Sequence, residues 1–382
     1  MRRALFTEEH ELFRNQFRHF VEKEVAPKVA GWNEAGYCDR TTWKRMGEEG
    51  YLGANAPEEY GGTNAGFVYD VIIIEELAWV RAHSLLTLLH CDIVMPYLVK
   101  HGTEDQKRRY LPAAIRGEKI LGICMTEPSG GSDLAALKTR ARRDGDHWIL
   151  NGSKIFTTHG WSGDLFVVAA RTDAAADRPH EGITLFLVEA ETPGFTKSRR
   201  LEKVGLKGQD TGEIFIEDCR VPAANLLGGE GQGFKMMMDG LQQERLVCAV
   251  SAVMACRRSL YDTTEYVKQR TAFGQPIAAF QNTQFKIAEM ATEIELGQAL
   301  VDRVLESHVA GESVVTEVSM AKWWTTELHK RLTSQCMQLW GGYGVMLEFP
   351  IANDYADAAI STIGGGTSEI MKVIISRRLG LG

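Results

Sequence analysis

The sequence predicts a mainly α-helical protein with a central β domain. Apolar residues recur at helical spacing through the first 118 residues and again after residue 233. The stretch from 121 to 221 is instead rich in Val, Ile, Leu and Phe, interrupted by turns of Gly, Pro and Asp. This order of helical, β and helical parts disfavours a doubly wound dinucleotide-binding fold, in which strands and helices alternate.

The first region is expected to begin with a capped helix. Thr7 can accept hydrogen bonds from the free N–H groups of the first turn, where two glutamates favour the helix dipole. Pro27 is expected to end this helix, because proline lacks an N–H donor. Further helices are expected near residues 40–50, 67–80 and 84–100.

In the central region, Asp144-Gly145 predicts a hairpin turn. A short strand over 147–151 should follow it. Helical patterns return after the glycine-rich segment 228–233, which we interpret as a connector rather than a nucleotide loop. Further strands are predicted over 164–171, 182–189 and 213–217.

Composition excludes several classes of function. The chain has 382 residues, 44% of them hydrophobic, which suits two or three domains. Its net charge of -7 does not favour binding to nucleic acid or to an anionic membrane. No apolar run approaches the ~20 residues that cross a bilayer, and the start lacks a secretory segment. We therefore expect a cytoplasmic protein, or a mitochondrial-matrix protein if it is a processed eukaryotic one.

The seven cysteines are interpreted as reduced thiols, because their number is odd and no spacing suits a metal. Motifs of other enzyme classes are absent from the sequence. There is no GxGxxG after a strand, no phosphate loop ending in GKS/T, and no GxSxG elbow.

One acidic residue lies on an apolar helix face. Met237, Glu244 and Cys248 fall on one side of the helix predicted after residue 233. A carboxyl group there is partly desolvated, which raises its pKa and suits a general base. The alternative is a glutamate that is solvated or paired with Arg245 or Arg258.

Two glycine-containing segments could approach a ligand closely. Residues 124–133 follow a predicted strand with small and hydroxyl side chains, and residues 364–366 are three glycines before a Thr/Ser helix cap. The alternatives are an ordinary loop and an ordinary helix start.

Taken together, five segments resemble signatures of the acyl-CoA dehydrogenase family, in order and over nearly the whole chain. They read MTEP with GSD within 125–133, NGSKIFTT at 151–158, YVKQRTAFG at 266–274, QLWGGYG at 338–344 and GTSEI at 366–370.

The resemblance implies an N-terminal helical domain (1–118), a middle β-barrel-like domain (119–228) and a C-terminal four-helix-bundle-like domain (229–382). It also implies bound FAD and a homotetramer, with part of each FAD site supplied by a neighbouring subunit. The residues implied in FAD binding are Met125, Thr126, Ser132, Phe156, Thr158, Arg270, Phe273, Gln281, Gln338, Gly341, Gly342, Thr367 and Glu369.

The catalytic base departs from the commonest family pattern. Many members carry a glutamate at the position of Gly365, whereas the long-chain and isovaleryl branches carry it in the helix after the β domain. The stretch LQQERL at 241–246 is similar to that second version, so the resemblance also selects Glu244. The residues implied in substrate binding are Ser132, Lys235, Gln242, Gln243, Arg245, Gly365 and Gly366.

The implied reaction converts an acyl-CoA into the trans-2-enoyl-CoA, as in fatty acid β-oxidation. Glu244 would remove the α-proton while flavin N5 accepts the β-hydride. The thioester carbonyl would be held by the FAD ribityl hydroxyl and the N–H of Gly365. An electron-transfer flavoprotein is the expected electron acceptor. The alternatives are a flavin oxidase on the same fold and a flavin-binding scaffold without activity.

Overall fold

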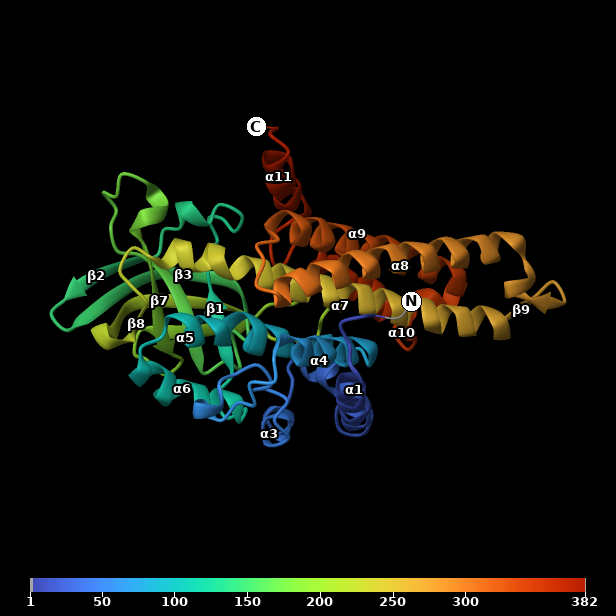
Figure 1. Ribbon diagram of the computed structural model, residues 1–382, viewed down its shortest axis with the longest axis horizontal. Helices are drawn as coiled ribbons and strands as arrows, with labels where there is room; N and C mark the ends of the chain where they lie inside the picture. Colours follow the sequence, from blue (N-terminus) through green and yellow to red (C-terminus); the bar gives the residue numbers. More distant parts are fainter. Residues whose placement is uncertain (1–2, 382) are drawn as a thin grey trace.

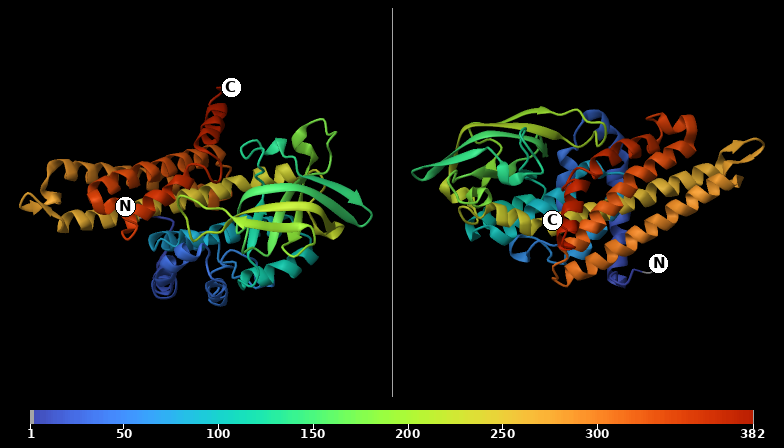
Figure 2. Two further views of the ribbon diagram at one scale, coloured as in Figure 1. Left: turned by 180° about the vertical axis from the view of Figure 1, so that it is seen from behind. Right: turned by 90° about the horizontal axis from the view of Figure 1, so that it is seen from above.

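The structure, a computed structural model, describes residues 3–381. It confirms the predicted order of helical, β and helical parts. In Figure 1 the sheet occupies one end of an elongated molecule and long helices extend from it to the other end. The N-terminal helices lie along one side of both parts, and the view from behind in Figure 2 gives the same arrangement.

Thr7 caps the first helix as predicted: its hydroxyl accepts a hydrogen bond from the N–H of His10. Pro27, however, does not end the helical path. A π-helical turn and a 3-10 turn continue the chain. Pro27 lies at the start of the 3-10 turn, where backbone N–H groups have no acceptor within the helix, so its missing N–H costs no hydrogen bond. The helices of this part are α1 (Glu8–Phe20), α2 (Val29–Ala35), α3 (Arg40–Glu48), α4 (Phe67–Trp79), α5 (Met95–His101) and α6 (Glu104–Ile115).

The predicted hairpin at Asp144-Gly145 joins two antiparallel strands, and Gly145 has the positive φ of 62° that this turn requires. The strands predicted over 147–151 and 213–217 are each 12 residues long, because they pair with one another across bulges. The strands are β1 (Leu121–Cys124), β2 (Arg140–Asp144), β3 (His147–Thr158), β4 (Leu165–Arg171), β5 (Ile183–Glu189), β6 (Phe195–Arg200), β7 (Thr211–Pro222) and β8 (Leu226–Leu227).

The strands form one sheet in the order β6-β7-β3-β2-β4-β5-β8, with β1 beside β4. Within the described residues, this path ends on β6 and β8, so the barrel-like domain is an open sheet. Both faces of β4 are buried. Leu165 and Val167 join a core shared with the helices, while Phe166 and Val168 join a second core on the other face.

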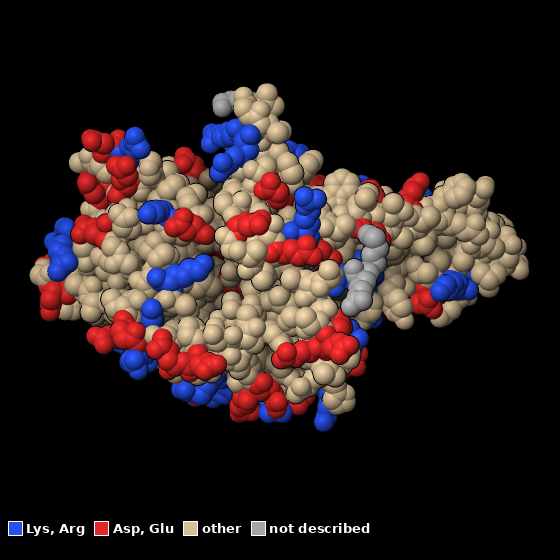
Figure 3. Space-filling model, in the orientation of Figure 1, with Lys and Arg blue, Asp and Glu red and all other residues tan. Residues whose placement is uncertain are grey.

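The C-terminal part is dominated by α7, a helix of 37 residues that is about 55 Å long. A small hairpin connects its far end to the next helix (Figure 1). α11 projects from the bundle and places two arginines in its last turn, within the patch of basic side chains seen over this helix in Figure 3. The elements are α7 (Gly233–Gln269), β9 (Thr271–Ala272), β10 (Gln275–Pro276), α8 (Gln281–Val309), α9 (Val315–Trp340), α10 (Pro350–Ser361) and α11 (Ser368–Arg378).

The cysteines are unpaired, and five of the seven are buried. No helix among residues 3–381 combines the length and the apolar character needed to span a bilayer.

Candidate active site

Glu244 lies on α7, and its side chain is buried between this helix and α5. The hydroxyl of Tyr97 donates a hydrogen bond to Oε1 of Glu244 at 3.1 Å. Burial raises the pKa of Glu244 to about 7, although the Tyr97 hydrogen bond and the charge of Arg245 oppose the rise. A carboxyl group with this pKa is half ionised near neutral pH and can act as a general base.

A glycine lets the two helices approach one another at this point. A Cβ atom on Gly240, one turn before the base, would lie 3.0 Å from both Glu244 Oε1 and the Tyr97 hydroxyl. The missing side chain therefore leaves room for the hydrogen bond. A cavity of about 120 Å³ opens here, and its lining includes Tyr97, Gly240, Gln243, Ile93 and Met236.

The arginines considered as partners of Glu244 do not form an ion pair with it. Arg258 instead bridges to Asp262 at 3.0 Å. Arg245 is buried, and its Nε has no hydrogen-bond partner among the described residues. Glu244 is therefore neither solvated nor paired with Arg245 or Arg258, the two alternatives considered from the sequence.

The segment 364–366 contacts the same face of α7 one turn further along. Gly365 and Gly366 have φ values of 67° and 99°, a conformation that other residues rarely adopt. A Cβ atom on Gly365 would lie 3.1 Å from the Sγ atom of Cys248. Glycine thus allows the backbone of this segment to reach the helix that carries Glu244.

A buried lysine holds this segment in place. The ammonium group of Lys322 on α9 donates hydrogen bonds to the carbonyl oxygens of Gly366, at 2.6 Å, and Ser361, at 3.1 Å. Thr367 then caps α11 by accepting a hydrogen bond from the N–H of Ile370, as the sequence predicts. Lys322 therefore fixes the loop from behind, and the cap fixes its end.

In the β domain, a second buried lysine organises the segment after β1. Lys154 on β3 forms an ion pair with Glu127 at 2.8 Å and donates to the carbonyl of Met125. The N–H groups of Lys138 and Thr139 also donate to Glu127. Despite burial, these partners lower the pKa of Glu127 to about 2, so its carboxylate stays charged.

This network brings together several residues implied in FAD binding. The N–H of Ile155 donates to the carbonyl of Thr126, which places Met125 and Thr126 beside Phe156. Phe156 has a positive φ of 56° and a side chain that is 66% exposed. Trp161, beyond the end of β3, is 42% exposed. An apolar surface next to backbone groups suits a flat aromatic ligand.

Family models match almost the whole chain. The N-terminal domain of acyl-CoA dehydrogenase matches residues 7–118, the middle domain matches 122–219 and the C-terminal domain matches 231–380. The chain belongs to the acyl-CoA dehydrogenase family.

Named relatives agree with this assignment. The chain is 45% identical to the mitochondrial long-chain specific acyl-CoA dehydrogenase of Sus scrofa over 99% of its own length and 88% of the relative. It is 36% identical to the mitochondrial isovaleryl-CoA dehydrogenase of Pongo abelii over 97% and 88%. The crystal structure of an acyl-CoA dehydrogenase from Geobacillus kaustophilus is 52% identical, covers 100% of both chains and superposes with a TM-score of 0.98.

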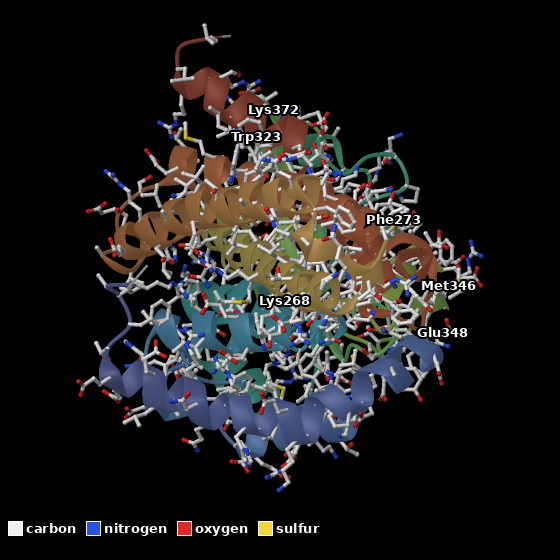
Figure 4. The ribbon with its side chains drawn as sticks, turned by 90° about the vertical axis from the view of Figure 1, so that its right-hand side faces the viewer. Lys268, Phe273, Trp323, Met346, Glu348 and Lys372 are labelled. Atoms are coloured by element: carbon white, nitrogen blue, oxygen red, sulfur yellow. The ribbon has the colours of Figure 1, made fainter. Side chains whose placement is uncertain are left out.

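The acyl-CoA dehydrogenase places another group of implied FAD residues at its far end. Arg270 follows α7 and packs on the ring of Tyr343 at 5.6 Å. Phe273, in the β9–β10 hairpin, is 95% exposed. Figure 4 looks onto this end and shows Phe273 with Met346 and Lys268. Within one chain these residues are not brought together with Phe156. The implied residues that are exposed at or near this end are Arg270, Phe273, Gln281, Gln338, Gly341 and Gly342.

The residues expected to bind substrate have different surroundings. Gln243 lines the cavity and donates a hydrogen bond to the backbone oxygen of Asp92 at 2.7 Å. Gln242 is occupied elsewhere, because both ends of its amide bind the connection between α8 and α9. Ser132 and Lys235 are exposed, and neither is among the residues that line the cavity.

Three side chains of the dehydrogenase's site were not identified from sequence. Tyr97 is separated from Glu244 by 147 positions. Lys154 lies within the NGSKIFTT segment, and its place directly before Ile155 and Phe156 could have suggested burial. Lys322 stands between Ala321 and two tryptophans in a helical pattern, which is a comparable signal for a buried charge.

Proposed function

We propose that the enzyme dehydrogenates an acyl-CoA thioester between its α and β carbons, with Glu244 as the base that removes the α-proton. The supporting observation is a buried carboxyl group with a pKa of about 7, hydrogen-bonded by Tyr97 beside a cavity. This environment keeps a fraction of Glu244 ionised at neutral pH while making its carboxylate a stronger base than a solvated one.

The α-C–H of a thioester is a weak acid, so the developing enolate must be stabilised as the proton leaves. We assign this role to the backbone N–H of Gly365, which lies on the segment fixed by Lys322. A backbone donor does not need a side chain, and glycine is the residue best suited to a φ of 67°. Proton removal and charge stabilisation would then come from α7 and from the segment that precedes α11.

The residues around Phe156 fit the isoalloxazine of FAD, which would contact its exposed ring and the backbone at Met125 and Thr126. When bound, FAD supplies the acceptor for the β-hydride. Ser132, Thr158, Thr367 and Glu369 are proposed to complete this side of the site. We propose that the exposed residues near Arg270 and Phe273 contact the FAD of a neighbouring subunit in a homotetramer.

We further propose an electron-transfer flavoprotein as electron acceptor, a cytoplasmic or mitochondrial-matrix location, and domain boundaries at 118/119 and 228/229. The long-chain relative supports a role in fatty acid β-oxidation, with a chain-length preference to be measured.

Loading with FAD and anaerobic titration with acyl-CoA thioesters test the proposal. We expect a yellow oligomer whose flavin bleaches with at least one acyl-CoA. Reoxidation should be faster with an electron-transfer flavoprotein than with oxygen. A protein that takes up FAD but is bleached by no thioester is a scaffold, and rapid reoxidation by oxygen identifies an oxidase. Either result would overturn the proposal.

A further inference from the structure

The thiol of Cys248 lies beside the segment to which the thioester carbonyl is assigned. A Cβ atom on Gly365 would lie 3.1 Å from the Sγ atom, so the thiol is close to the backbone of this segment. Within 244–250 of α7, Cys248 is the one residue that is not buried. Gly364 and Gly365, on the other side of the contact, are exposed. The thiol therefore borders the open side of the proposed site.

Cys248 also lies on the same face of α7 as the proposed base. Glu244 precedes it by four positions, and side chains with this spacing are neighbours whose Cβ atoms are about 5–6 Å apart. The α-carbon from which Glu244 would take a proton is bonded directly to the β-carbon. A thiol one helical turn from the base is therefore placed to reach the bond that the enzyme would oxidise.

Two buried cations close to this thiol form no ion pair with any residue that the structure describes. Arg245 on α7 is 5% exposed and Lys322 on α9 is 0% exposed, and the charges of both act on Cys248. Among residues 3–381, Nε of Arg245 also lacks a hydrogen-bond partner. A buried charge without a counter-charge is unfavourable, so a ligand on which negative charge develops would compensate it. The enolate of a thioester is a ligand of this kind.

We propose that Cys248 is a covalent site for α,β-unsaturated acyl thioesters, the class of compound that the proposed reaction forms. This inference rests on the proposed function, which places the thioester at Gly365. The sulfur of Cys248 adds to the β-carbon of a bound trans-2-enoyl-CoA. The resulting thioether blocks the site until the addition reverses.

The addition needs no further reactant. The S–H proton passes to the carboxylate of Glu244, and a sulfur electron pair forms the bond to the β-carbon. The π electrons of the carbon–carbon double bond move into the thioester as an enolate, which the N–H of Gly365 and the two cations stabilise. Glu244 then returns the proton to the α-carbon. No group leaves, and the flavin is neither oxidised nor reduced in this step.

The thiol depends on Glu244 as its base. Burial raises the pKa of Cys248, and although the charges of Lys322 and Arg245 oppose the rise, the thiol is protonated at neutral pH. The thiolate is the nucleophilic form, so a nearby proton acceptor is required. Glu244 is partly ionised near neutral pH, because its pKa is about 7. The addition is therefore expected to be slower than turnover and to accumulate with time.

The test supplies trans-2-enoyl-CoA directly to the FAD-loaded enzyme. Intact-mass measurement after an acid quench counts the acyl-CoA molecules that are added, and peptide mapping locates them. We expect one addition per chain, on Cys248. The modified fraction should no longer bleach its flavin with a saturated acyl-CoA. With a saturated acyl-CoA and an electron acceptor, the same adduct should appear only after turnover.

Two variants show whether the addition belongs to this thiol. Cys248→Ala should abolish the added mass. Cys91→Ala should keep it, because Cys91 is the other cysteine that is not fully buried, and its Sγ atom donates to the carbonyl of Leu52 in the N-terminal part. Peptide mapping of the wild type alone decides the matter if Cys248→Ala does not fold.

The outcomes separate this inference from the proposed function. If supplied enoyl-CoA adds no mass, or adds it only at Cys91, the inference is wrong, and bleaching by a saturated acyl-CoA still supports the proposed function. If no saturated acyl-CoA bleaches the flavin, the proposed function is wrong. The supplied enoyl-CoA then still decides whether Cys248 is the covalent site, because this arm needs no dehydrogenation.

Discussion

Tyr97 donates a hydrogen bond to Glu244 at 3.1 Å from a helix that lies 147 positions earlier in the chain. This bond favours the ionised form of Glu244 and so opposes the effect of burial on its pKa. The geometry of α5 against α7, and not the sequence around Glu244 alone, therefore sets the pH range in which the base is active.

Replacing this tyrosine should shift the pH profile of flavin reduction. In Tyr97→Phe, Glu244 loses a hydrogen bond to its charged form, so its pKa rises above about 7. The rate of flavin reduction should then reach its plateau only at a higher pH. At a fixed pH well below the pKa, the rate should fall about tenfold for each unit by which the pKa of Glu244 rises. Stopped-flow bleaching between about pH 5 and pH 9 measures this.

Tyr110→Phe is a matched control for that shift. Tyr110 is also buried, and its hydroxyl donates to a glutamate, Glu189, at 3.1 Å, but on the sheet rather than at the site. Its replacement should leave the pH profile in place. Equal shifts in both variants would show that Tyr97 does not act on Glu244.

The raised pKa of Glu244 also predicts a pH-dependent cost to stability. Because the folded pKa is about 7 and the ordinary value is 4.5, its stabilising contribution is present below pH 4.5 and is lost as the pH rises through 7. Glu244→Gln removes this dependence. Relative to wild type, the variant should gain up to about 3 kcal/mol of unfolding free energy across this window. Chemical denaturation of both proteins near each end of the window measures it, and a constant difference would contradict the burial effect.

Lys322 is expected to act through the segment at Gly365. In Lys322→Met, the carbonyls of Gly366 and Ser361 lose a charged donor, which should cost about 1–3 kcal/mol of stability. We expect flavin reduction to slow while the pH profile keeps its position, because the base itself is unchanged. Lys330→Met alters an exposed lysine on the same helix and should leave both properties near wild type.

The ion pair of Lys154 with Glu127 predicts a larger loss. Lys154→Met leaves a buried carboxylate without its charged partner, which should cost about 3–5 kcal/mol and weaken FAD retention. The exposed pair of Arg220 with Asp144 on the same sheet is the control, because Arg220→Met should cost about 0–1 kcal/mol. Equal melting temperatures for the two variants would contradict the role given to Lys154.

Much of the fold follows from local pattern. The cap at Thr7, the hairpin at Gly145 and the continuous apolar run of β4 are set by neighbouring residues, and each was predicted correctly. The path after Pro27 was not, because tertiary packing continues the helical turns beyond the end of α1. β6 was missed because its exposed, basic sequence has little apolar alternation.

In the site, too, local pattern identified some residues, whereas the contacts made by tertiary packing could not be predicted. Helical periodicity and the family resemblance both selected Glu244, and the structure buries it as that periodicity implies. Its partner Tyr97 and the lysine behind Gly365 come from other helices, so no local pattern could pair them.

The most direct test of the central claim is the rate of anaerobic flavin bleaching in Glu244→Gln. The change keeps the shape of the side chain, so the variant should retain FAD and bind acyl-CoA. Loss of the general base should slow bleaching by about 10²–10⁴-fold. Bleaching at the wild-type rate would show that another group removes the α-proton.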